Sequence, residues 1–404
     1  MTYEAIVTRI KTSPHPNADK IQLGNCLGYQ VIVDLNTKDN ELGVFFPSDG
    51  KLSNRFLEVN NLLKPKGFFD TNGRVRIQRF RGEKSEGFWC PLSYFNFDNI
   101  STSLFYEGMK FTELDGIKIC EKYFTPKTRR SGEKNQTKNK QRKEIIEFPK
   151  HYDTKQLRYN LEEFKTGDTV YVTEKLHGTS GRTGKVKVKY YPWYKWLFKS
   201  FLKPNEKILE ISGTRNCIVN SNANGERSRK YRVQIHNKLI NKCKDGEILY
   251  YEIVGYMENN KPIMPNHKYN KIKDKDIKKL QKLYGEEMEY SYGCKIGECD
   301  LYIYRITQNE KDLSFEEVLN RCIELNEKCV PVIDVFKIEN REQFLLKIEH
   351  YSQGSSTIGK NHIREGVCVK KNDGLAYKYK GYWFCELEDI SKMNDEYVDP
   401  EEVS

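Results

Sequence analysis

The residues that most clearly suggest chemistry are 173–180, which read Thr-Glu-Lys-Leu-His-Gly-Thr-Ser. The segment before them, residues 168–173, is rich in β-branched and aromatic side chains and predicts a strand. Lys175 would end that strand, and Gly178 permits a tight turn. Desolvation and nearby cations disfavour the charged form of a lysine, as a nucleophilic lysine requires. A surface lysine before a glycine turn is the alternative, because short motifs match by chance.

Residues 173–180 resemble motif I of the covalent nucleotidyltransferases, a superfamily of DNA ligases, RNA ligases and mRNA capping enzymes. Five later stretches resemble the following motifs in the same order. They are Ser-Gly-Thr-Arg-Asn at 212–216 (motif Ia), Tyr-Tyr-Glu-Ile-Val-Gly at 250–255 (III), Leu-Tyr-Ile-Tyr-Arg-Ile at 301–306 (IIIa), Glu-Gly-Val-Cys-Val-Lys at 365–370 (IV) and Ala-Tyr-Lys-Tyr-Lys at 376–380 (V). Each match alone is weak, but six in order are a strong signal. The Lys-x-His-Gly form of motif I looks most like the nick-sealing ligase-2 group of RNA ligases.

The resemblance implies catalytic and metal-binding roles for five side chains. Lys175 would attack the α-phosphorus of ATP and form lysyl-AMP. Lys378 and Lys380 would neutralise the α-phosphate as charge builds on its oxygens. Glu365 would bind Mg²⁺ or Mn²⁺, directly or through water. Glu252 would hold the ribose hydroxyls or a metal-bound water.

The resemblance also implies contacts to the nucleotide. Glu174 would face the adenine amino group, and Tyr304 would stack on the base. Arg215 would contact the ribose or the acceptor 3′ end. His177 would assist around the phosphates, and Gly178, which follows it, would also belong to the nucleotide site. A structural hydrogen bond is the usual role of a lone histidine. The chain departs from the pattern at Ser180, where phage ligase-2 enzymes carry Asn, and at Arg305, where an acidic residue often follows the aromatic.

The spacing of motifs IV and V predicts their geometry directly. Asn-Asp-Gly at 372–374 is a strong hairpin signal between two strand-forming runs. The two motifs should therefore lie on adjacent antiparallel strands. Alternation along the second strand puts Lys378 and Lys380 on one face, where a bound phosphate would need two cations. Paired lysines on an exposed strand face are the ordinary alternative.

These observations favour an ATP-dependent RNA ligase. It would join 3′-hydroxyl and 5′-phosphate ends, at nicks in duplexes with an RNA 3′-hydroxyl strand, through lysyl-AMP and an adenylylated 5′ end. A capping guanylyltransferase shares the lysine chemistry, but capping enzymes and DNA ligases carry their OB domain after motif V, and only residues 382–404 follow it here. A non-catalytic RNA-binding protein on a ligase fold is the other alternative. The complete set of catalytic side chains argues against it.

Composition agrees with a soluble enzyme that binds a polyanion. The chain has 404 residues, a formal net charge of +11 and 31% charged residues. This excess of basic residues suits RNA or a nicked RNA-containing duplex as partner. No signal peptide and no apolar run of membrane-spanning length is present. The 11 cysteines are scattered without CxxC pairs, which predicts reduced thiols in a cytoplasmic compartment. We also expect a monomer.

The first 125 residues predict an OB-fold domain that binds nucleic acid. Short β-rich runs at 3–10, 30–34, 43–46, 74–80 and 88–91 alternate with turn clusters, as in a small barrel. Residues 46–53 and 79–87 resemble the N-terminal domain of Deinococcus-type RNA ligases, which precedes the nucleotidyltransferase domain. The predicted contacts to nucleic acid are Arg74, Arg76, Arg79, Arg81 and Lys84. The alternative is that the alternating arginines form the solvent-exposed face of an amphipathic strand.

The remaining chain completes an α+β prediction. Residues 126–144 form a basic flexible linker, which either helps to hold phosphates or is a solvated tether. Residues 145–390 form an ATP-grasp-like ligase/capping domain of antiparallel sheets flanked by helices, including 271–284, 315–325 and 341–351. The aromatic and basic insertion at 185–207 has three interpretations: a packed flap, an RNA-stacking surface or a membrane-surface helix. Residues 391–404 form an acidic tail.

Overall fold

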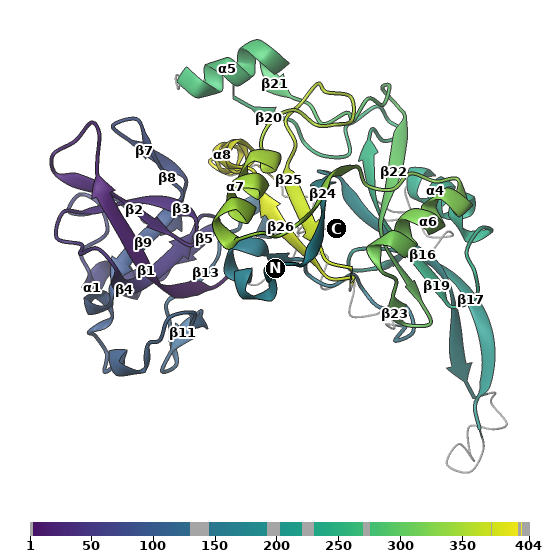
Figure 1. The fold of residues 1–404 in the computed structure, drawn as a ribbon, viewed down its shortest axis with the longest axis horizontal. Coiled ribbons are helices and arrows are strands. Elements are labelled where there is room, and N and C mark those ends of the chain that lie inside the picture. The colour runs from purple at the N-terminus through teal and green to yellow at the C-terminus, as the bar shows by residue number, and fades with distance from the viewer. Residues whose placement is uncertain are drawn as a thin grey trace. The chain divides into compact units, whose positions relative to one another are not determined.

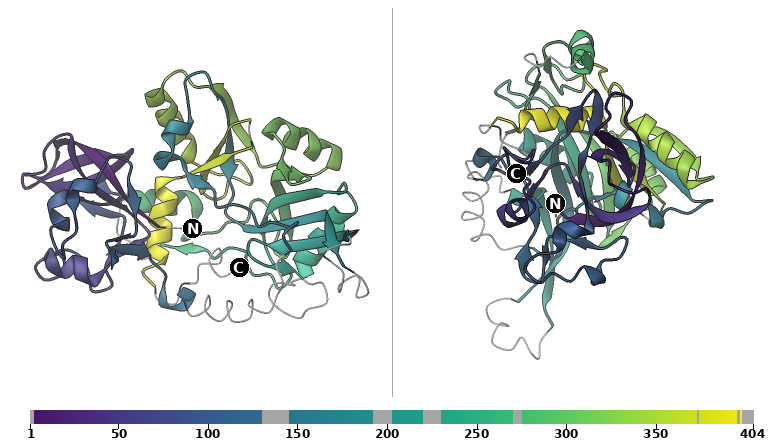
Figure 2. Two further views of the ribbon diagram at one scale, coloured as in Figure 1. Left: turned by 90° about the horizontal axis from the view of Figure 1, so that it is seen from below. Right: turned by 90° about the vertical axis from the view of Figure 1, so that its left-hand side faces the viewer.

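The computed structural model describes residues 3–129, 145–191, 203–219, 230–269, 275–372, 374–394 and 397. The chain divides into two compact units, Met1–Thr125 and Pro126–Ser404. Strands dominate both units and helices flank the sheets of the second, so the α+β prediction is confirmed (Figures 1 and 2). Most of the predicted linker, the tip of the 185–207 insertion and most of the acidic tail lie outside the described residues.

The first unit is built on a barrel-like sheet. Its strands follow the order β3-β2-β1-β4-β9, and β10 also pairs with β1. These strands are β1 (Ala5–Pro14), β2 (Ile21–Cys26), β3 (Tyr29–Asp34), β4 (Glu41–Pro47), β9 (Gly87–Pro91) and β10 (Lys110–Phe111). The free edge of β3 meets the segment before β9, where the Glu86 N–H donates to the Gln30 carbonyl at 2.8 Å. The sheet is therefore nearly closed around a core that includes Val44, Phe46 and Phe95.

Smaller elements complete the first unit. Three short strands, β13-β5-β6, form a second sheet. The remaining elements are β5 (Gly50–Leu52), β6 (Arg74–Val75), β7 (Gln78–Phe80), β8 (Glu83–Ser85), β11 (Glu113–Leu114), β12 (Ile117–Lys118), β13 (Cys120–Lys122), α1 (Asn54–Val59) and the 3-10 helices Leu92–Phe95 and Thr102–Leu104. The strand predicted at 74–80 is wrong as one element. It is two strands, of which β6 pairs with β5 and β7 pairs with β8.

Two sheets form the second unit. One has the order β14-β26-β25-β15-β24, and the other has the order β18-β17-β16-β19-β22-β23. The first comprises β14 (Lys155–Gln156), β15 (Thr169–Lys175), β24 (Val332–Lys337), β25 (Gly366–Lys370) and β26 (Ala376–Lys380); the second comprises β16 (Thr179–Tyr190), β17 (Asn205–Thr214), β18 (Ile218–Val219), β19 (Glu247–Gly255), β22 (Cys299–Gln308) and β23 (Lys311–Asp312). Their pairings are antiparallel except for β14 with β26. Residues 176–178 connect β15 to β16, so the predicted nucleophile lies where the chain passes from one sheet to the other.

The second unit has helices at the three predicted places (α5, α6 and α7) and at two that were not predicted (α4 and α8). They are α4 (Lys230–Ile240), α5 (Lys275–Tyr284), α6 (Phe315–Leu325), α7 (Arg341–Ser352) and α8 (Tyr382–Ser391), with 3-10 helices at Leu157–Tyr159 and Leu161–Glu163 and a short ribbon of β20 (His267–Lys268) with β21 (Glu287–Met288). Ser314 caps α6 in a capping box with Glu317, and Asn340 accepts from the N–H of Gln343 at the start of α7. Among the described helices, none is long and apolar enough to cross a bilayer.

The five-stranded sheet has two unlike faces. On one face, Val170, Val172, Val367 and Val369 pack with α7 in a closed apolar cluster that also holds Tyr377 and Tyr379. Side chains alternate along each strand, so the residues between them point to the opposite face. That opposite face carries Lys175, Lys378 and Lys380. Burial of the valine face fixes the register and thereby decides which lysines meet.

The 185–207 insertion begins and ends as a strand pair. β16 and β17 pair from Gly181↔Thr214 to Tyr190↔Asn205. Their far ends project away from the rest of the second unit (Figure 1). Val186 and Val188 are buried beside Phe148, whereas Lys187 and Lys189 lie outside that apolar cluster. The described part of the insertion is thus a β-hairpin arm packed at its base.

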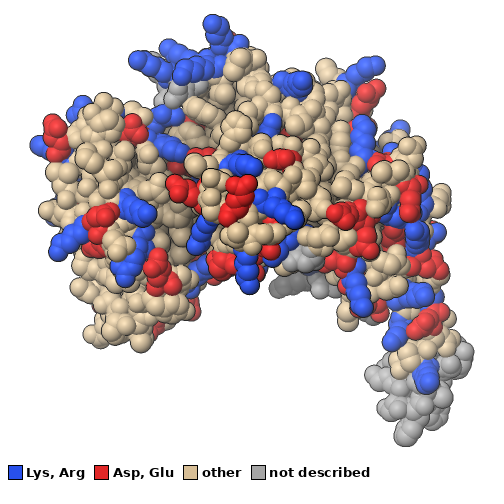
Figure 3. Space-filling model, viewed as in Figure 1, with Lys and Arg blue, Asp and Glu red and all other residues tan. Residues whose placement is uncertain are grey.

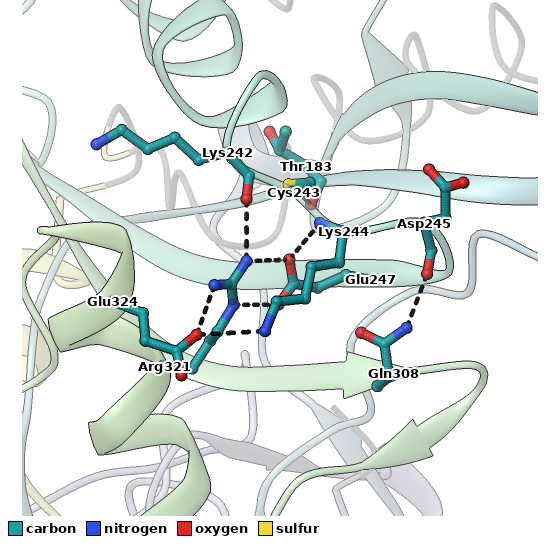
Figure 4. Close-up of polar contacts among 9 residues, drawn as sticks. All are labelled: Thr183, Lys242, Cys243, Lys244, Asp245, Glu247, Gln308, Arg321 and Glu324. Carbon is teal, nitrogen blue, oxygen red and sulfur yellow. Dashed lines mark hydrogen bonds and ion pairs between the residues drawn. The ribbon is translucent and has the colours of Figure 1, made fainter.

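A buried ion cluster fastens α6 to the start of β19 (Figure 4). The Arg321 guanidinium donates from Nε and Nη2 to the two carboxylate oxygens of Glu247, at 2.7 and 3.0 Å. Nη2 also donates to the Lys242 carbonyl at 2.9 Å, and the Lys244 N–H donates to Glu247 at 2.8 Å. Glu247 is 1% exposed, so each of its oxygens has a partner in place of water. The cluster holds the strand that carries Glu252.

Candidate active site

Strand register brings the predicted lysines of motifs I and V together. Lys175 of β15 lies opposite Gly366 of β25, and Gly366 lies opposite Lys380 of β26. One step along, Cys368 of β25 lies between Thr173 and Lys378 in the same way. The predicted hairpin of motifs IV and V is confirmed. Three lysines therefore share one face of the five-stranded sheet, with only a glycine and a cysteine between them.

A buried carboxylate faces these lysines. Glu365 is 0% exposed, and its Oε2 lies 2.7 Å from Lys175 Nζ and 3.6 Å from His177 Nδ1. Its Oε1 lies 3.4 Å from Lys380 Nζ. Burial opposes ionisation, but Lys175 and Lys380 outweigh it and hold the pKa of Glu365 well below its usual range. The site therefore carries a fixed anion beside the predicted nucleophile.

Lys380 has a second carboxylate that motif reasoning missed. Glu388 of α8 accepts from Lys380 Nζ at 3.0 Å, and its other oxygen pairs with Lys392 at 3.2 Å. Burial opposes ionisation of Glu388, but Lys380 and Lys392 hold its pKa well below the usual range. Glu388 follows the last motif on a separate helix, so no sequence signal links it to Lys380. Only the packing of α8 against the sheet reveals the contact.

The turn after Lys175 requires glycine because the second sheet comes very close. A Cβ on Gly178 would lie 2.4 Å from the Ile253 carbonyl oxygen and 2.9 Å from Glu252 Cγ. The reason is close approach rather than an unusual φ. β16 then pairs with β19, so that Ser180 lies opposite Glu252 and its hydroxyl donates to Glu252 Oε2 at 3.1 Å. The departure at Ser180 thus has a defined contact with the carboxylate of motif III.

Tyr304 lies on the second sheet and is tied to the first. The ammonium group of Lys370, at the end of motif IV, donates to the Tyr304 carbonyl at 2.8 Å and lies 4.1 Å from the Phe315 ring centroid. Burial lowers the pKa of Lys370. Burial, and to a smaller extent Glu252, raises the pKa of Tyr304. Lys370 was not among the predicted site residues, although its place in the motif was the available signal.

Glu174 and His177 are both buried beside Lys175. Glu174 Oε2 accepts from the N–H and the hydroxyl of Thr357, at 2.8 and 2.6 Å, which leaves Oε1 without a partner among the described residues. The His177 N–H donates to the Tyr292 hydroxyl at 2.6 Å, and its ring packs against Phe384 with centroids 4.8 Å apart. Glu174 is thus oriented by a distant loop, and its unpartnered oxygen is available to a donor such as an amino group.

Arg215 lies at the edge of the same region. Its guanidinium pairs with Asp153. Its positive charge lowers the pKa of Tyr304, against the larger effect of burial, which raises it. Arg215 and Asp153 both belong to the second unit, and only Arg215 was predicted as a site residue. The structure therefore groups the predicted nucleotide-site residues around the junction of the two sheets.

The predicted nucleic-acid residues of the first unit differ in exposure and in partners. Arg74 is 4% exposed and lies over the Tyr123 ring at 4.7 Å, so it packs rather than points outward. Arg76 pairs with Asp70 at 3.3 Å. Lys84 pairs with Glu86 at 3.1 Å, while Arg79 and the exposed Arg81 belong to the β7–β8 hairpin. Because the 74–80 run breaks into two strands, its arginines are not the alternating face of one amphipathic strand.

Similarity to known proteins agrees with this geometry. The RNA ligase family model matches residues 168–383, more than half of the chain. A comparison with curated protein sequences finds no significant match. Among solved structures, an RNA ligase variant of Naegleria gruberi with ATP and Mn has a TM-score of 0.62 at 20% identity, covering 95% of this chain and 99% of that one. A second variant of that ligase, with AMP and Mn, has a TM-score of 0.60 at 18% identity over 97% and 99%.

These structural matches share the fold of both units, and the family match covers all the motif residues from Lys175 to Lys380. All 11 cysteines are free thiols. Because the family model matches more than half of the chain, and Glu365 lies against Lys175 and Lys380 within the matched region, the chain belongs to the RNA ligase family.

Proposed function

We propose that this RNA ligase is ATP-dependent and joins 3′-hydroxyl and 5′-phosphate ends at nicks in duplexes with an RNA 3′-hydroxyl strand. One observation carries the proposal: Lys175 ends a strand with Glu365 at 2.7 Å and Lys380 directly across the sheet. A nucleophilic amine, an anion that can accept its charge and a cation for a phosphate are thereby collected on one face. The complexes of the Naegleria ligase with ATP and Mn support the same nucleotide.

The reaction would proceed in three steps. Lys175 Nζ loses a proton and attacks the α-phosphorus of ATP, so that an N–P bond forms and the bond to pyrophosphate breaks. The 5′-phosphate of the nick then attacks the same phosphorus and releases the lysine. Finally the 3′-hydroxyl attacks the activated 5′-phosphate, and AMP leaves. Storing AMP on Lys175 splits one difficult transfer into easier ones, and the protein contributes positioning and charge neutralisation.

The described residues supply these contributions at defined places. Lys378 and Lys380 would neutralise α-phosphate charge from the face they share with Lys175. Glu174 would accept from the adenine amino group with its unpartnered Oε1, and Tyr304 would stack on the base. Ser180 would orient Glu252 toward the ribose. Arg215 would then lie near the ribose or the acceptor 3′ end.

Two carboxylates of this region, Glu365 and Glu252, would hold a divalent cation. Glu365 and Glu252 offer carboxylate oxygens, which Mg²⁺ and Mn²⁺ prefer, and Lys175 and Lys380 keep Glu365 ionised by lowering its pKa against the effect of burial. A bound cation would add positive charge beside the α-phosphate and favour the unprotonated form of Lys175. The Naegleria ligase complexes hold Mn together with ATP and with AMP.

The first unit would be an OB domain of the Deinococcus-type arrangement that binds the nicked RNA. Its nearly closed sheet of short antiparallel strands supports this proposal. The β7–β8 hairpin, with Arg79, Arg81 and Lys84, would contact the phosphate backbone. Replacing these three residues with Gln should leave lysine adenylylation intact and weaken nick sealing. Equal sealing by the variant and the parent protein would contradict this role.

The central test is incubation with α-³²P-labelled ATP and Mg²⁺, followed by a denaturing gel. We expect a labelled band that vanishes in Lys175→Ala, because only the lysine can hold AMP through denaturation. Lys371→Ala is the matched control and should label normally, since Lys371 directly follows β25 but pairs with Asp168 instead. Labelling with GTP alone would favour a capping-type enzyme, and no labelling with either nucleotide would overturn the proposal.

A further inference from the structure

Helix α5 (Lys275–Tyr284) presents a stripe of lysines that the catalytic site does not use. Lys275, Lys278, Lys279 and Lys282 are exposed and recur at i, i+3, i+4 and i+7. This spacing places them on one side of a helix. Ile277 and Leu280 are buried, at 1% and 7% exposed, on the opposite side. The packed side fixes the helix, so the lysines must point outward together.

The stripe is not an ordinary solvated face. Like charges at i, i+3 and i, i+4 destabilise a helix, and α5 contains four such pairs on this side. At the same i, i+4 spacing, helix α6 instead carries residues of opposite charge, as Glu317 and Arg321 illustrate. Among the residues that the structure describes, Lys275, Lys278 and Lys282 have no acidic partner. Figure 3 shows blue side chains gathered over α5 at the top of the view.

The stripe is anchored next to the nucleotide site. The hydroxyl of Tyr284, the last residue of α5, hydrogen bonds with the Ser355 hydroxyl at 2.6 Å. Two residues later, Thr357 donates twice to Glu174, the neighbour of Lys175. A short chain of contacts within the second unit therefore connects α5 to motif I. The C-terminal end of α5 therefore contacts the same loop that orients Glu174.

We propose that the lysine stripe of α5 binds the phosphate backbone of the RNA duplex beside the nick. This rests on the proposed function and adds the surface that holds the substrate. The stripe rises about 10 Å along the helix, which is long enough to face several phosphates of one duplex. Lysines bind phosphates as flexible point charges, so the interaction gives affinity and register without reading sequence. A polyanion also relieves the repulsion among the four lysines.

The test is a triple variant, Lys275→Gln, Lys278→Gln and Lys282→Gln, in the full chain. Gln is a good helix former, so the helix should persist. The binding of a nicked RNA duplex is measured over a range of salt concentrations. The slope of log K against log salt should become shallower by about 0.9 for each phosphate that is no longer neutralised by a lysine. Nick sealing at low RNA concentration should fall with it, while labelling by α-³²P ATP should match the parent protein.

Two matched variants separate local binding from net charge. Lys311→Gln, Lys337→Gln and Lys347→Gln remove the same charge from exposed lysines on β23, β24 and α7 and should leave the slope nearly unchanged. The variant Lys275→Arg, Lys278→Arg and Lys282→Arg keeps the charge and should keep the parent slope. An α5 Gln variant with the parent slope, or with the same slope as the control, would overturn the inference. Loss of labelling in the parent protein would instead overturn the proposed function, so the two failures are distinguishable.

Discussion

Two buried glutamates of the second unit have opposite surroundings. Glu247 accepts a bidentate contact from the Arg321 guanidinium, at 2.7 and 3.0 Å, and a hydrogen bond from the Lys244 N–H, so both of its oxygens have partners (Figure 4). Glu365 faces Lys175, Lys380 and His177 at 2.7, 3.4 and 3.6 Å, yet neither of its oxygens has a hydrogen bond of good geometry among the described residues. One carboxylate is saturated by its partners, while the other is surrounded by charges and left incompletely satisfied.

The difference teaches how a fold separates stability from reactivity. An Arg–carboxylate fork fixes geometry and leaves nothing for a ligand. Lysines are mobile point charges, and Lys175 and Lys380 are each 17% exposed, so they can turn from Glu365 toward an incoming phosphate. An unsaturated buried anion is costly in a resting protein. Its presence beside the predicted nucleophile is therefore what a site for a cation and a nucleotide would require.

The largest effect should come from neutralising the unsaturated carboxylate. Glu365→Gln removes the anion that faces Lys175 and would hold the divalent cation, so we expect labelling by α-³²P ATP to be lost. The fold should survive, because the lysines it leaves behind reach water. Circular dichroism and thermal unfolding check the fold, and the denaturing gel checks the label. Full labelling by this variant would erase the distinction between the two glutamates.

The same substitution at the saturated carboxylate should act on stability instead. Glu247→Gln removes the buried charge partner of Arg321 and leaves it the exposed Glu324, which costs up to about 3–5 kcal/mol of unfolding free energy. Labelling of the folded protein at low temperature should persist, because the Glu247–Arg321 cluster touches no predicted site residue. Urea unfolding measures the loss. A variant that stays stable but fails to label would place Glu247 in the catalytic machinery.

Much of this contrast was open to prediction from the sequence, and part was not. The motifs gave Lys175, Glu365, Lys378 and Lys380, and strand alternation with the hairpin signal gave their shared face. Each of these features depends on residues that are close together in the sequence, so the sequence alone can reveal it. The single strand predicted at 74–80 was wrong because the chain leaves one sheet for another within that run.

Long-range packing accounts for the residues that were missed. Glu388 reaches Lys380 from a helix, Thr357 reaches Glu174 across 183 positions of the chain, and Lys370 links the two sheets through the Tyr304 carbonyl. No spacing rule joins residues so far apart, because their contacts depend on how helices and loops settle on the sheets. Arg321 and Glu247 escaped notice for the same reason.

The second carboxylate of Lys380 provides a finer test. Glu388→Gln should let Lys380 turn fully to Glu365, away from the α-phosphate. A hydrogen bond to a charged group is worth about 1.5–3 kcal/mol, so the adenylylation rate at saturating ATP should fall about tenfold or more. Lys392→Gln breaks the other ion pair of Glu388 and is the control, with a much smaller effect. Equal effects would reduce Glu388 to a helix-stabilising residue, and Glu388→Asp should restore part of the rate.

His267 and His362, two buried histidines that pack against Tyr290, extend the comparison to neutral groups. Burial lowers the pKa of His267 to about 3 and that of His362 to about 4, below the value near 6.5 of an unfolded chain. The folded state then binds fewer protons, so its stability is complete above pH 6.5 and is lost as pH falls. Each histidine contributes up to about 1.4 kcal/mol per pH unit. Urea unfolding between pH 7.5 and 5, where carboxylates contribute little, should show this slope, and His267→Asn should reduce it.

The smallest effect should come from the Ser180 hydroxyl, which gives Glu252 one hydrogen bond at 3.1 Å. Ser180→Ala should cost about 1 kcal/mol, roughly fivefold, in ATP binding. Because Glu252 would hold the ribose equally in the ground and transition states, KM for ATP should rise while the rate at saturating ATP stays the same. Initial-rate labelling over a range of ATP concentrations separates the two. A fall in the saturated rate would instead mean that Glu252, like Glu365, acts on the phosphate that is being transferred.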